Sequence, residues 1–335
     1  MKLPITILNC LLIFTVLILS PVTPYALDKV RMGFGSVSAI HGHVWIAQEK
    51  GLFNKYGIDP ELIVIGGGGS VTALIAGDVQ FGTGPGYSLI SANLNGADLV
   101  MVAASLNKGV QRVMARPDLQ TPAQLRGRKI GITRFGTPSH FVLQLMLRRW
   151  GMTPADVQTI QVGSSPAMVA SLERGGIDAA VLTFPSVFIA EEKGYRVLAD
   201  LADMDVSYMH EMIDTTRTYL RTNRDIVTRF IKAYLEGIAY FKQHKQESLE
   251  VLKKKLRADP RAEAHLERAY DLLAFKYFER APHPSLDGVK TVLEFIAKEN
   301  PKAKTADPKS FMDGAIMNEL EASGFIRTLY EKSNK

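Results

Sequence analysis

The sequence predicts an α/β protein of two lobes, each a mostly parallel sheet flanked by helices. Three observations lead to this prediction. Apolar, strand-like runs alternate with helical segments up to Tyr208, which is the order typical of parallel sheets. The landmarks of the first half recur in the second half, and after Tyr208 the apolar residues repeat at helical spacing. With 335 residues, the chain can form two lobes that each have a core.

The internal repeat is defined by matched residues. Asp78 matches Asp178 at a separation of 100 residues, and His41 matches His140 at a separation of 99. Each repeat consists of a strand, a loop, a helix, a strand, a loop, a short helix and a strand. In such sheets, ligands bind beyond the carboxyl ends of the strands, beside helix N-termini. We therefore expect a ligand site between the lobes.

Four strand-to-helix loops are the expected walls of this site: residues 36–41, 66–70, 134–140 and 163–165. The second loop holds four consecutive glycines, but no Lys follows Gly69 as a phosphate-binding P-loop would require. Its glycines either leave backbone N–H groups bare for a ligand or form a surface turn without a ligand role. Ser70 is the expected N-cap of the helix that follows.

The polar side chains of these loops are mostly hydrogen-bond donors, and none is a carboxylate. Arg134 would either clamp an oxyanion through its planar fork or point to solvent. His41 and His140 would either bind the ligand or cap their helices. We therefore expect a small organic molecule with at least one anionic group, held at helix N-termini.

Aromatic residues at strand ends could stack on a flat ligand, and ordinary packing is the alternative. Phe135 belongs to this group, with Tyr87, Phe184 and Tyr208. The complete set of predicted ligand-binding residues is Ser36, Ser38, His41, Gly67, Gly68, Gly69, Ser70, Gly84, Pro85, Tyr87, Arg134, Thr137, Ser139, His140, Ser164, Ser165, Phe184, Pro185 and Tyr208.

Motifs for metal binding or catalysis are absent from the sequence. There is no H-E-x-x-H, G-x-S-x-G or C-x-x-C pattern. His41 and His43 are two residues apart, so they do not share a helix face as metal ligands would. We expect no metal, no cofactor and no enzymatic activity.

The charge pattern argues against a nucleic-acid partner. The net charge is +6, but acidic and basic residues are interspersed without a long basic run or zinc-finger spacing. The basic balance is compatible with an acidic small ligand.

Residues 1–26 have the pattern of a secretory signal peptide. Lys2 is the only charged residue among them, and residues 5–19 are almost wholly apolar. This run is shorter than the about 20 residues of a membrane span, so we expect cleavage after Ala26 and export to the periplasm. An uncleaved leader that tethers the protein to the membrane is the alternative. The only cysteine, Cys10, lies in the leader, which leaves the exported chain without thiol chemistry.

The domain boundaries follow from the repeat. We expect residues 27–113 to form the first part of lobe 1, residues 114–213 to form lobe 2, and residues 214–335 to return to lobe 1 as helices. A hinge is expected at residues 113–116 and 211–216. One helix should start after Asn223, where apolar residues recur every four positions.

Several segments resemble a known family. They are GLFNKYGIDPELIVIGGGGSVTALIAGDVQFGTG, TPAQLRGRKIGI, SLERGGIDAAVL and KSFMDGAIMNELEASGFI. They are similar to the nitrate/sulfonate/taurine class of solute-binding proteins for ABC importers, which includes relatives that bind pyrimidine precursors of thiamine. The resemblance covers essentially the whole mature chain. It implies a two-lobed periplasmic-binding-protein fold (type II-like) and a monomer that closes on a small molecule.

The resemblance also implies partners: a membrane permease and its separate ATPase. An enzyme on the same fold is the alternative, either a lyase or a relative of the single-turnover pyrimidine synthases that resemble this family. That synthase class is cytosolic and has a cysteine-rich segment, whereas this chain has a leader and no cysteine beyond it. An exported sensory binding subunit is the third possibility.

Overall fold

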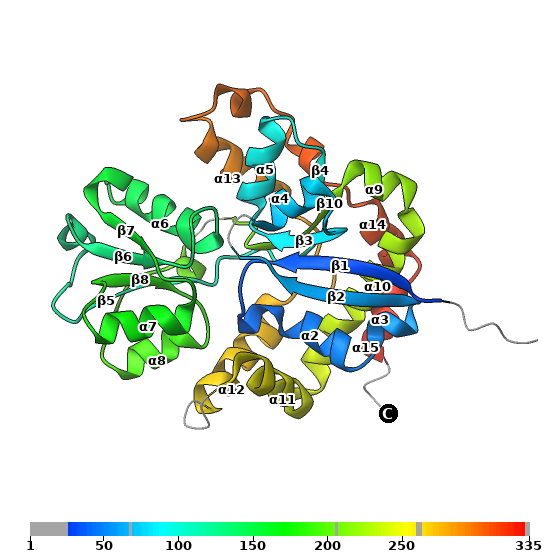
Figure 1. Ribbon diagram of the computed structural model, residues 1–335, viewed down its shortest axis with the longest axis horizontal. Helices are drawn as coiled ribbons and strands as arrows, with labels where there is room; N and C mark the ends of the chain where they lie inside the picture. The colour runs from blue at the N-terminus through cyan, green and yellow to red at the C-terminus, as the bar shows by residue number, and fades with distance from the viewer. Residues whose placement is uncertain (1–25, 67–68, 205–206, 259–262, 332–335) are drawn as a thin grey trace, which may run out of the picture.

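The computed structural model describes residues 26–66, 69–204, 207–258 and 263–331. Two five-stranded sheets lie at the centres of two lobes, which stand side by side (Figure 1). The sheet of lobe 1 has the order β2-β1-β3-β10-β4. Its strands are β1 (Asp28–Phe34), β2 (Ile58–Val64), β3 (Phe81–Gly84), β4 (Leu99–Leu106) and β10 (Glu211–Thr216).

The sheet of lobe 2 has the order β7-β6-β8-β5-β9. Its strands are β5 (Arg112–Ala115), β6 (Lys129–Ile132), β7 (Gln158–Gln161), β8 (Ala179–Leu182) and β9 (Arg196–Asp200). In both sheets the first three strands are parallel, and the fourth strand is antiparallel to both of its neighbours. The two orders are therefore equivalent, and the predicted two-fold repeat is confirmed at the level of strand topology.

The antiparallel strand of each sheet comes from the other half of the chain. β5 follows directly after β4 of lobe 1, and β10 follows directly after β9 of lobe 2. The chain therefore passes between the sheets twice. The first passage is residues 107–111, and the described part of the second is residues 207–210, directly before β10. We call these segments the two crossings. The end of the second crossing is hydrogen-bonded to the end of β4, which precedes the first crossing: His210 N donates to Leu106 O over 2.9 Å.

These crossings come earlier than the hinge that the sequence suggested. Residues 113–116 and 211–216 were expected to bend, but β5 and β10 lie there and pair with strands on both sides. The predicted boundaries at 113/114 and 213/214 cut through these two strands. A short apolar run between two lobes resembles a linker in the sequence, and only its pairing shows that it is the fourth strand of a sheet.

The helices of lobe 2 begin at strand ends and cover its sheet: α6 (Pro138–Arg149), α7 (Ser165–Glu173) and α8 (Ser186–Glu192). The helices of the first part of lobe 1 are α2 (Gly42–Glu49), α3 (Leu52–Lys55), α4 (Gly69–Ala76) and α5 (Gly86–Leu94). The helices after β10 are α9 (Arg217–Thr222), α10 (Arg224–Gln243), α11 (Lys245–Leu256), α12 (Glu263–Leu272), α13 (Leu286–Ile296), α14 (Ala315–Ala322) and α15 (Phe325–Glu331).

Short helical turns connect these elements: η2 (Ala39–His41), η3 (Pro122–Leu125), η4 (Pro154–Asp156), η5 (Leu201–Asp203), η8 (Pro301–Lys304) and η9 (Pro308–Phe311). A π-helical turn, η7 (Leu273–Tyr277), continues α12. In the part of the chain that the structure describes, no helix has both the length and the hydrophobicity needed to cross a bilayer.

Helix α10 anchors the helical return to lobe 1. It begins directly after Asn223, as predicted. Val227, Phe230 and Ile231 are buried and share the face that packs on the sheet. The Phe230 ring stacks on the ring of Phe81 in β3 at a centroid distance of 3.8 Å.

Helix α12 differs from the expectation that these helices pack on lobe 1 alone, because it also contacts α8 of lobe 2. Arg268 donates to Glu191 over 3.2 Å and covers the Phe188 ring at 3.9 Å. Accordingly, the buried apolar residues do not divide into one core per lobe. One cluster joins α2 and α10 to α7 and α8, and the other joins α5 and α13 to α6. Apolar packing therefore connects the lobes on both sides of the sheets.

Candidate functional site

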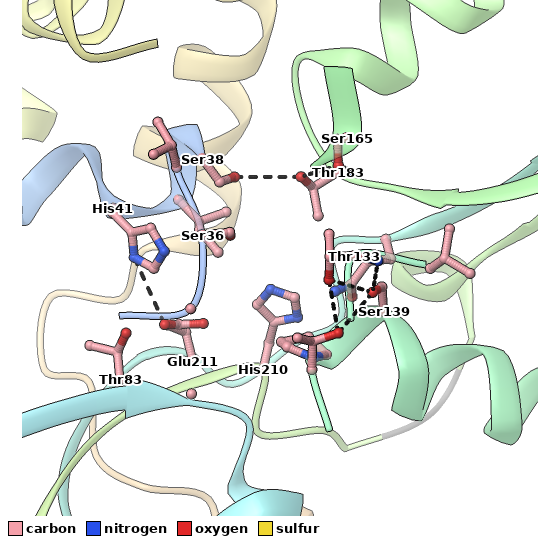
Figure 2. A pocket seen from close by; sticks show the side chains of 18 residues that line it. Ser36, Ser38, His41, Thr83, Thr133, Ser139, Ser165, Thr183, His210 and Glu211 are labelled. Carbon is pink, nitrogen blue, oxygen red and sulfur yellow. Dashed lines mark hydrogen bonds and ion pairs between the residues drawn. The ribbon is translucent and has the colours of Figure 1, made fainter. Parts of the chain in front are cut away.

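A cavity lies between the lobes where the carboxyl ends of the parallel strands meet. Its volume, counted as the space open to the centre of a water molecule, is about 50 Å³, whereas one water needs roughly 10–15 Å³ on that measure. Both lobes and both crossings contribute to the lining: Gly35, Ser36, Val37, Ser38, Ile40, His41, Thr83, Gly84, Gln111, Thr133, Thr137, Pro138, Ser139, Ser165, Val181, Thr183, His210 and Glu211. Figure 2 shows the polar members facing one another.

Lobe 2 contributes a wall of hydroxyl groups at the N-terminus of α6. Thr137 is the N-cap, and its hydroxyl donates to Arg134 O over 2.6 Å. Thr133 donates in turn to Thr137 Oγ1 over 2.8 Å. Ser139 Oγ accepts from Thr133 N over 3.0 Å, so its own proton remains available to a neighbouring hydroxyl or to the cavity.

The N-terminus of α7 continues this wall and connects it to lobe 1. Thr183 follows β8 and lies 3.3 Å from the hydroxyl of Ser165. On its other side, Thr183 Oγ1 lies 3.4 Å from the hydroxyl of Ser38 in lobe 1. This pair is a direct polar contact across the cleft (Figure 2).

Lobe 1 contributes a carboxyl group, Glu211, at the first position of β10. The residue is 4% exposed, and burial raises the pKa of its carboxyl from 4.5 to about 7, partly opposed by the Thr83 hydroxyl. His41 Nδ1 lies 3.8 Å from Glu211 Oε1, which is longer than a hydrogen bond. Burial lowers the pKa of His41 to about 3, so this imidazole is neutral at physiological pH.

The crossings contribute two further polar side chains, Gln111 and His210. They are 1% and 0% exposed. Gln111 Oε1 and both ring nitrogens of His210 have no hydrogen-bond partner among the described residues. Burial lowers the pKa of His210 to about 3, with a smaller contribution from His41, so the ring is neutral. Buried polar atoms nearly always form hydrogen bonds in native structures, so we expect these atoms to bond to a molecule in the cavity.

The cavity contains part of the predicted set of ligand-binding residues. Those that line it are Ser36, Ser38, His41, Gly84, Thr137, Ser139 and Ser165. Those that are described but do not line it are Gly69, Ser70, Pro85, Tyr87, Arg134, His140, Ser164, Phe184, Pro185 and Tyr208. Gly67 and Gly68 lie outside the described residues.

Arg134 lies at the rim, where the lobes meet, and not in the cavity. The residue is exposed, and its guanidinium lies against the backbone of Gly66 in the opposite lobe, where an added Cβ would be 3.3 Å from Cζ. Gly66 has a φ of +78°, a conformation that favours glycine. The described part of this loop therefore approaches an arginine of the other lobe instead of a cavity ligand.

Three other predicted residues have local roles in or next to their own helices. His140 Nδ1 accepts from Gly136 N over 3.2 Å, so this histidine closes the turn before α6. Ser164 is the N-cap of α7 and accepts from Ala167 N. Ser70 lies within α4 instead of capping it, because that helix begins at Gly69.

The predicted aromatic residues pack on other aromatic rings. Tyr208 stacks on Phe141 with a centroid distance of 4.8 Å and an interplanar angle of 2°. Phe184 stacks on Phe188 at 5.0 Å. Tyr87 packs on Phe141 at 5.1 Å. None of these rings lines the cavity, so packing explains each of them.

Sequence reasoning missed six polar lining residues: Thr83, Gln111, Thr133, Thr183, His210 and Glu211. Two of them gave a usable signal, since Thr133 directly follows β6 and Thr183 directly follows β8. Gln111 and His210 lie in the crossings and Glu211 follows the second one; only Glu211 fell in a predicted hinge segment, and none of the three was predicted to bind. Across residues 26–66, 69–204, 207–258 and 263–331, no group of three or more His, Cys, Asp or Glu side chains is placed to hold a metal ion.

Two lobes that exchange their fourth strands and enclose a polar cavity define the two-lobed periplasmic-binding-protein fold, in the type II-like form predicted. A solved structure shows the same fold. The alkanesulfonate-binding protein SsuA from Xanthomonas axonopodis pv. citri, bound to MOPS, matches with a TM-score of 0.70 and 16% identity over 86% of this chain and 99% of that chain.

Sequence comparisons identify the family. The family model described as NMT1/THI5 like matches residues 38–248. A binding protein of Brucella abortus (strain 2308) is 31% identical over 220 residues, which is 64% of this chain and 67% of the relative. The taurine-binding periplasmic protein of Escherichia coli (strain K12) is 30% identical over 135 residues, 40% of this chain and 41% of that protein. The chain belongs to the NMT1/THI5-like family.

Proposed function

We propose that this protein is an extracytoplasmic solute-binding protein of an ABC importer. It captures a small polar molecule in the cavity between the lobes and delivers it to a membrane permease. One observation carries the proposal: the cavity has walls from both lobes and from both crossings, so a ligand there can bind fully only when the lobes close. The binding-protein relatives support the same role.

Closure is the step that the architecture favours. The Ser38–Thr183 contact and the approach of Arg134 to Gly66 exist only when the lobes are together. The two crossings are the only covalent connections between the sheets in the described chain, so rotation about residues 107–111 and the segment ending at His210 would open the cavity. A ligand that contacts both walls stabilises the closed form by its differential affinity.

A binding role is also supported against an enzymatic one. Among the described hydrogen bonds, the cavity hydroxyls pair with one another or with backbone groups, and none pairs with a histidine base. Activation of a serine or threonine nucleophile needs such a base within hydrogen-bond reach. Export through the leader of residues 1–26 is part of the proposal, and it places the protein in the periplasm.

The test is ligand-dependent closure. The protein is screened by thermal shift against small polar solutes that include taurine, ethanesulfonate and nitrate, and each hit is examined by small-angle scattering. A ligand at 100 times its Kd adds about 2.7 kcal/mol to the free energy of unfolding. We expect at least one hit to raise the melting temperature and to reduce the radius of gyration. A hit that leaves the radius of gyration unchanged at saturation contradicts closure, and turnover of a hit would establish an enzyme.

A further inference from the structure

The two walls of the cavity differ in hydrogen-bonding polarity, and this difference suggests the class of ligand. The lining includes three buried polar side chains from the crossings and the start of β10, Gln111, His210 and Glu211, which we call the acceptor face. All three side chains are at most 4% exposed, and all three line the cavity. They come from the two crossings and from the start of β10, and Glu211 lies next to His41 and Thr83 of lobe 1 (Figure 2).

The acceptor face has unused acceptors. Gln111 Oε1 and both nitrogens of His210 have no partner within the described chain. A neutral imidazole has one acceptor nitrogen and one N–H donor, and an ionised carboxylate only accepts. Of the described residues that line the cavity, none is Lys or Arg, so no cation of the protein neutralises Glu211 there.

The opposite wall has the reverse polarity. Thr137 and Thr133 have committed their protons to Arg134 O and to Thr137 Oγ1. The Ser139 hydroxyl lies 2.8 Å and 3.0 Å from the hydroxyls of Thr133 and Thr137, so its proton goes either to one of these oxygens or to the cavity. Helices α6 and α7, of 12 and 9 residues, both begin at this wall. Their N-termini favour negative charge and acceptor groups.

Resting on the proposed binding function, we propose that the acceptor face selects ligands that carry an amino group, while the acceptor end of the same ligand lies at the N-termini of α6 and α7. The ligand is thus a small amphoteric molecule whose ammonium or amine donates to Gln111, His210 and Glu211. The cavity admits only a few water-sized groups in its closed form, so the two ends of the ligand are separated by a short spacer.

The expected ligand, a small organic molecule with at least one anionic group, is thereby narrowed to one that also carries an amino group. That expectation depended on loops without a carboxylate, but tertiary structure brings Glu211 to the cavity. An anion without an amino group would place like charge beside an ionised Glu211, whereas an ammonium provides the missing counter-charge and keeps the carboxyl ionised. A protonated Glu211 that donates to an anion is the competing arrangement, and the experiment separates the two.

The experiment compares matched solutes by isothermal titration calorimetry at pH 7.5. The first series is taurine and ethanesulfonate, and the second is β-alanine and propionate, so that each pair differs only in the amino group. In the wild type, we expect at least one amino-bearing member to bind, and to bind at least tenfold more tightly than its amine-free partner. Glu211→Gln should reduce that preference to less than threefold, because an amide has no negative charge to balance the ammonium.

Asp214→Asn is the matched control. Asp214 is 2% exposed and lies in the same strand, but it does not line the cavity. This variant should therefore keep the wild-type preference, and thermal unfolding of both variants confirms that they are folded. Equal binding of the amine-free members, or an unchanged preference in Glu211→Gln, overturns the inference and leaves the proposed binding function intact. No binding of any amino-bearing member also overturns it, and no binding by any solute in either screen counts against both proposals.

Discussion

The wall at the start of α6 and α7 and the acceptor face line one cavity of a repeated fold, yet they offer different chemistry. The wall of lobe 2 consists of hydroxyls that hydrogen-bond to one another at the start of α6 and α7. The acceptor face consists of Gln111, His210 and Glu211, whose buried atoms lack protein partners or a counter-charge in the described chain. The comparison shows that a two-fold repeat of topology does not impose a two-fold repeat of chemistry.

The difference arises from which segments form each wall. Loops before helices need capping groups, so Ser and Thr are expected there for local reasons. The side chains of Gln111 and His210 in the crossings cap no helix and line the cavity. A wall whose hydrogen bonds are made contributes to the stability of the folded protein, whereas buried polar atoms without partners reduce it.

The largest expected effect is the pH-dependent cost of burying Glu211. Its folded pKa of about 7 lies above the unfolded value of 4.5, so the folded state binds more protons between these values and loses stability as the pH rises through them. Glu211→Gln should match the wild type near pH 5. At pH 8 it should be more stable by about 3 kcal/mol, since one pKa unit corresponds to about 1.4 kcal/mol.

Urea unfolding of both proteins across this pH range measures the difference. The buried histidines His41 and His210 act in the opposite direction, because their lowered pKa values cost stability as the pH falls below 6.5. Comparison of variant with wild type at each pH removes most of that contribution. A pH-independent difference would show that Glu211 is not the group that titrates.

Replacement of the unpaired imidazole is expected to have the next largest effect. His210→Leu removes two buried nitrogens without partners in the described structure, and it should raise the stability of the ligand-free protein by about 1–3 kcal/mol. His140→Leu is the control on the other wall. It removes an acceptor that bonds Gly136 N, so it should lower stability. Thermal or urea unfolding measures whether each variant is more or less stable than the wild type. A destabilised His210→Leu would refute the contrast between the walls.

The contact across the cleft should have a smaller effect. Thr183→Val keeps the shape but removes the hydroxyl that reaches Ser38 and Ser165. Ligand affinity should fall by about 0.5–1.5 kcal/mol, or roughly two- to tenfold. Thr215→Val removes a comparable hydrogen bond to Gln80 O within lobe 1, and it should change stability without changing affinity. Calorimetry with a solute identified by the screen distinguishes the two.

The smallest effect is expected at Arg134. The sequence suggested an oxyanion clamp, whose removal would cost about 2–5 kcal/mol of binding. The side chain is exposed and lies against Gly66 outside the cavity. Arg134→Ala should therefore change affinity by less than about 0.5 kcal/mol, as is usual for surface substitutions. A loss in the larger range would show that Arg134 reaches the ligand in a conformation different from this one.

The predicted residues of the site are placed by local patterns in the sequence, whereas the missed residues are placed by contacts between distant segments of the chain. Ser139 and Ser165 were found because a strand followed by a small polar loop and a helix is readable over a few residues. His140 was expected in the cavity by analogy with His41, but its ring bonds the turn of its own helix. The repeat therefore predicted backbone positions better than side-chain roles.

The sequence by itself determined the alternation of strands and helices, the repeat, the donor-rich loops and the helical return after Asn223, because periodicity and capping are local. Only the tertiary structure decided that β5 and β10 exchange between the sheets, that both lobes share their apolar clusters, and that Gln111, His210 and Glu211 meet in one cavity. Strand exchange brings together residues about 100 positions apart. Their proximity follows from hydrogen bonding between strands and from packing of the whole chain, neither of which is encoded in the residues that neighbour them in the sequence.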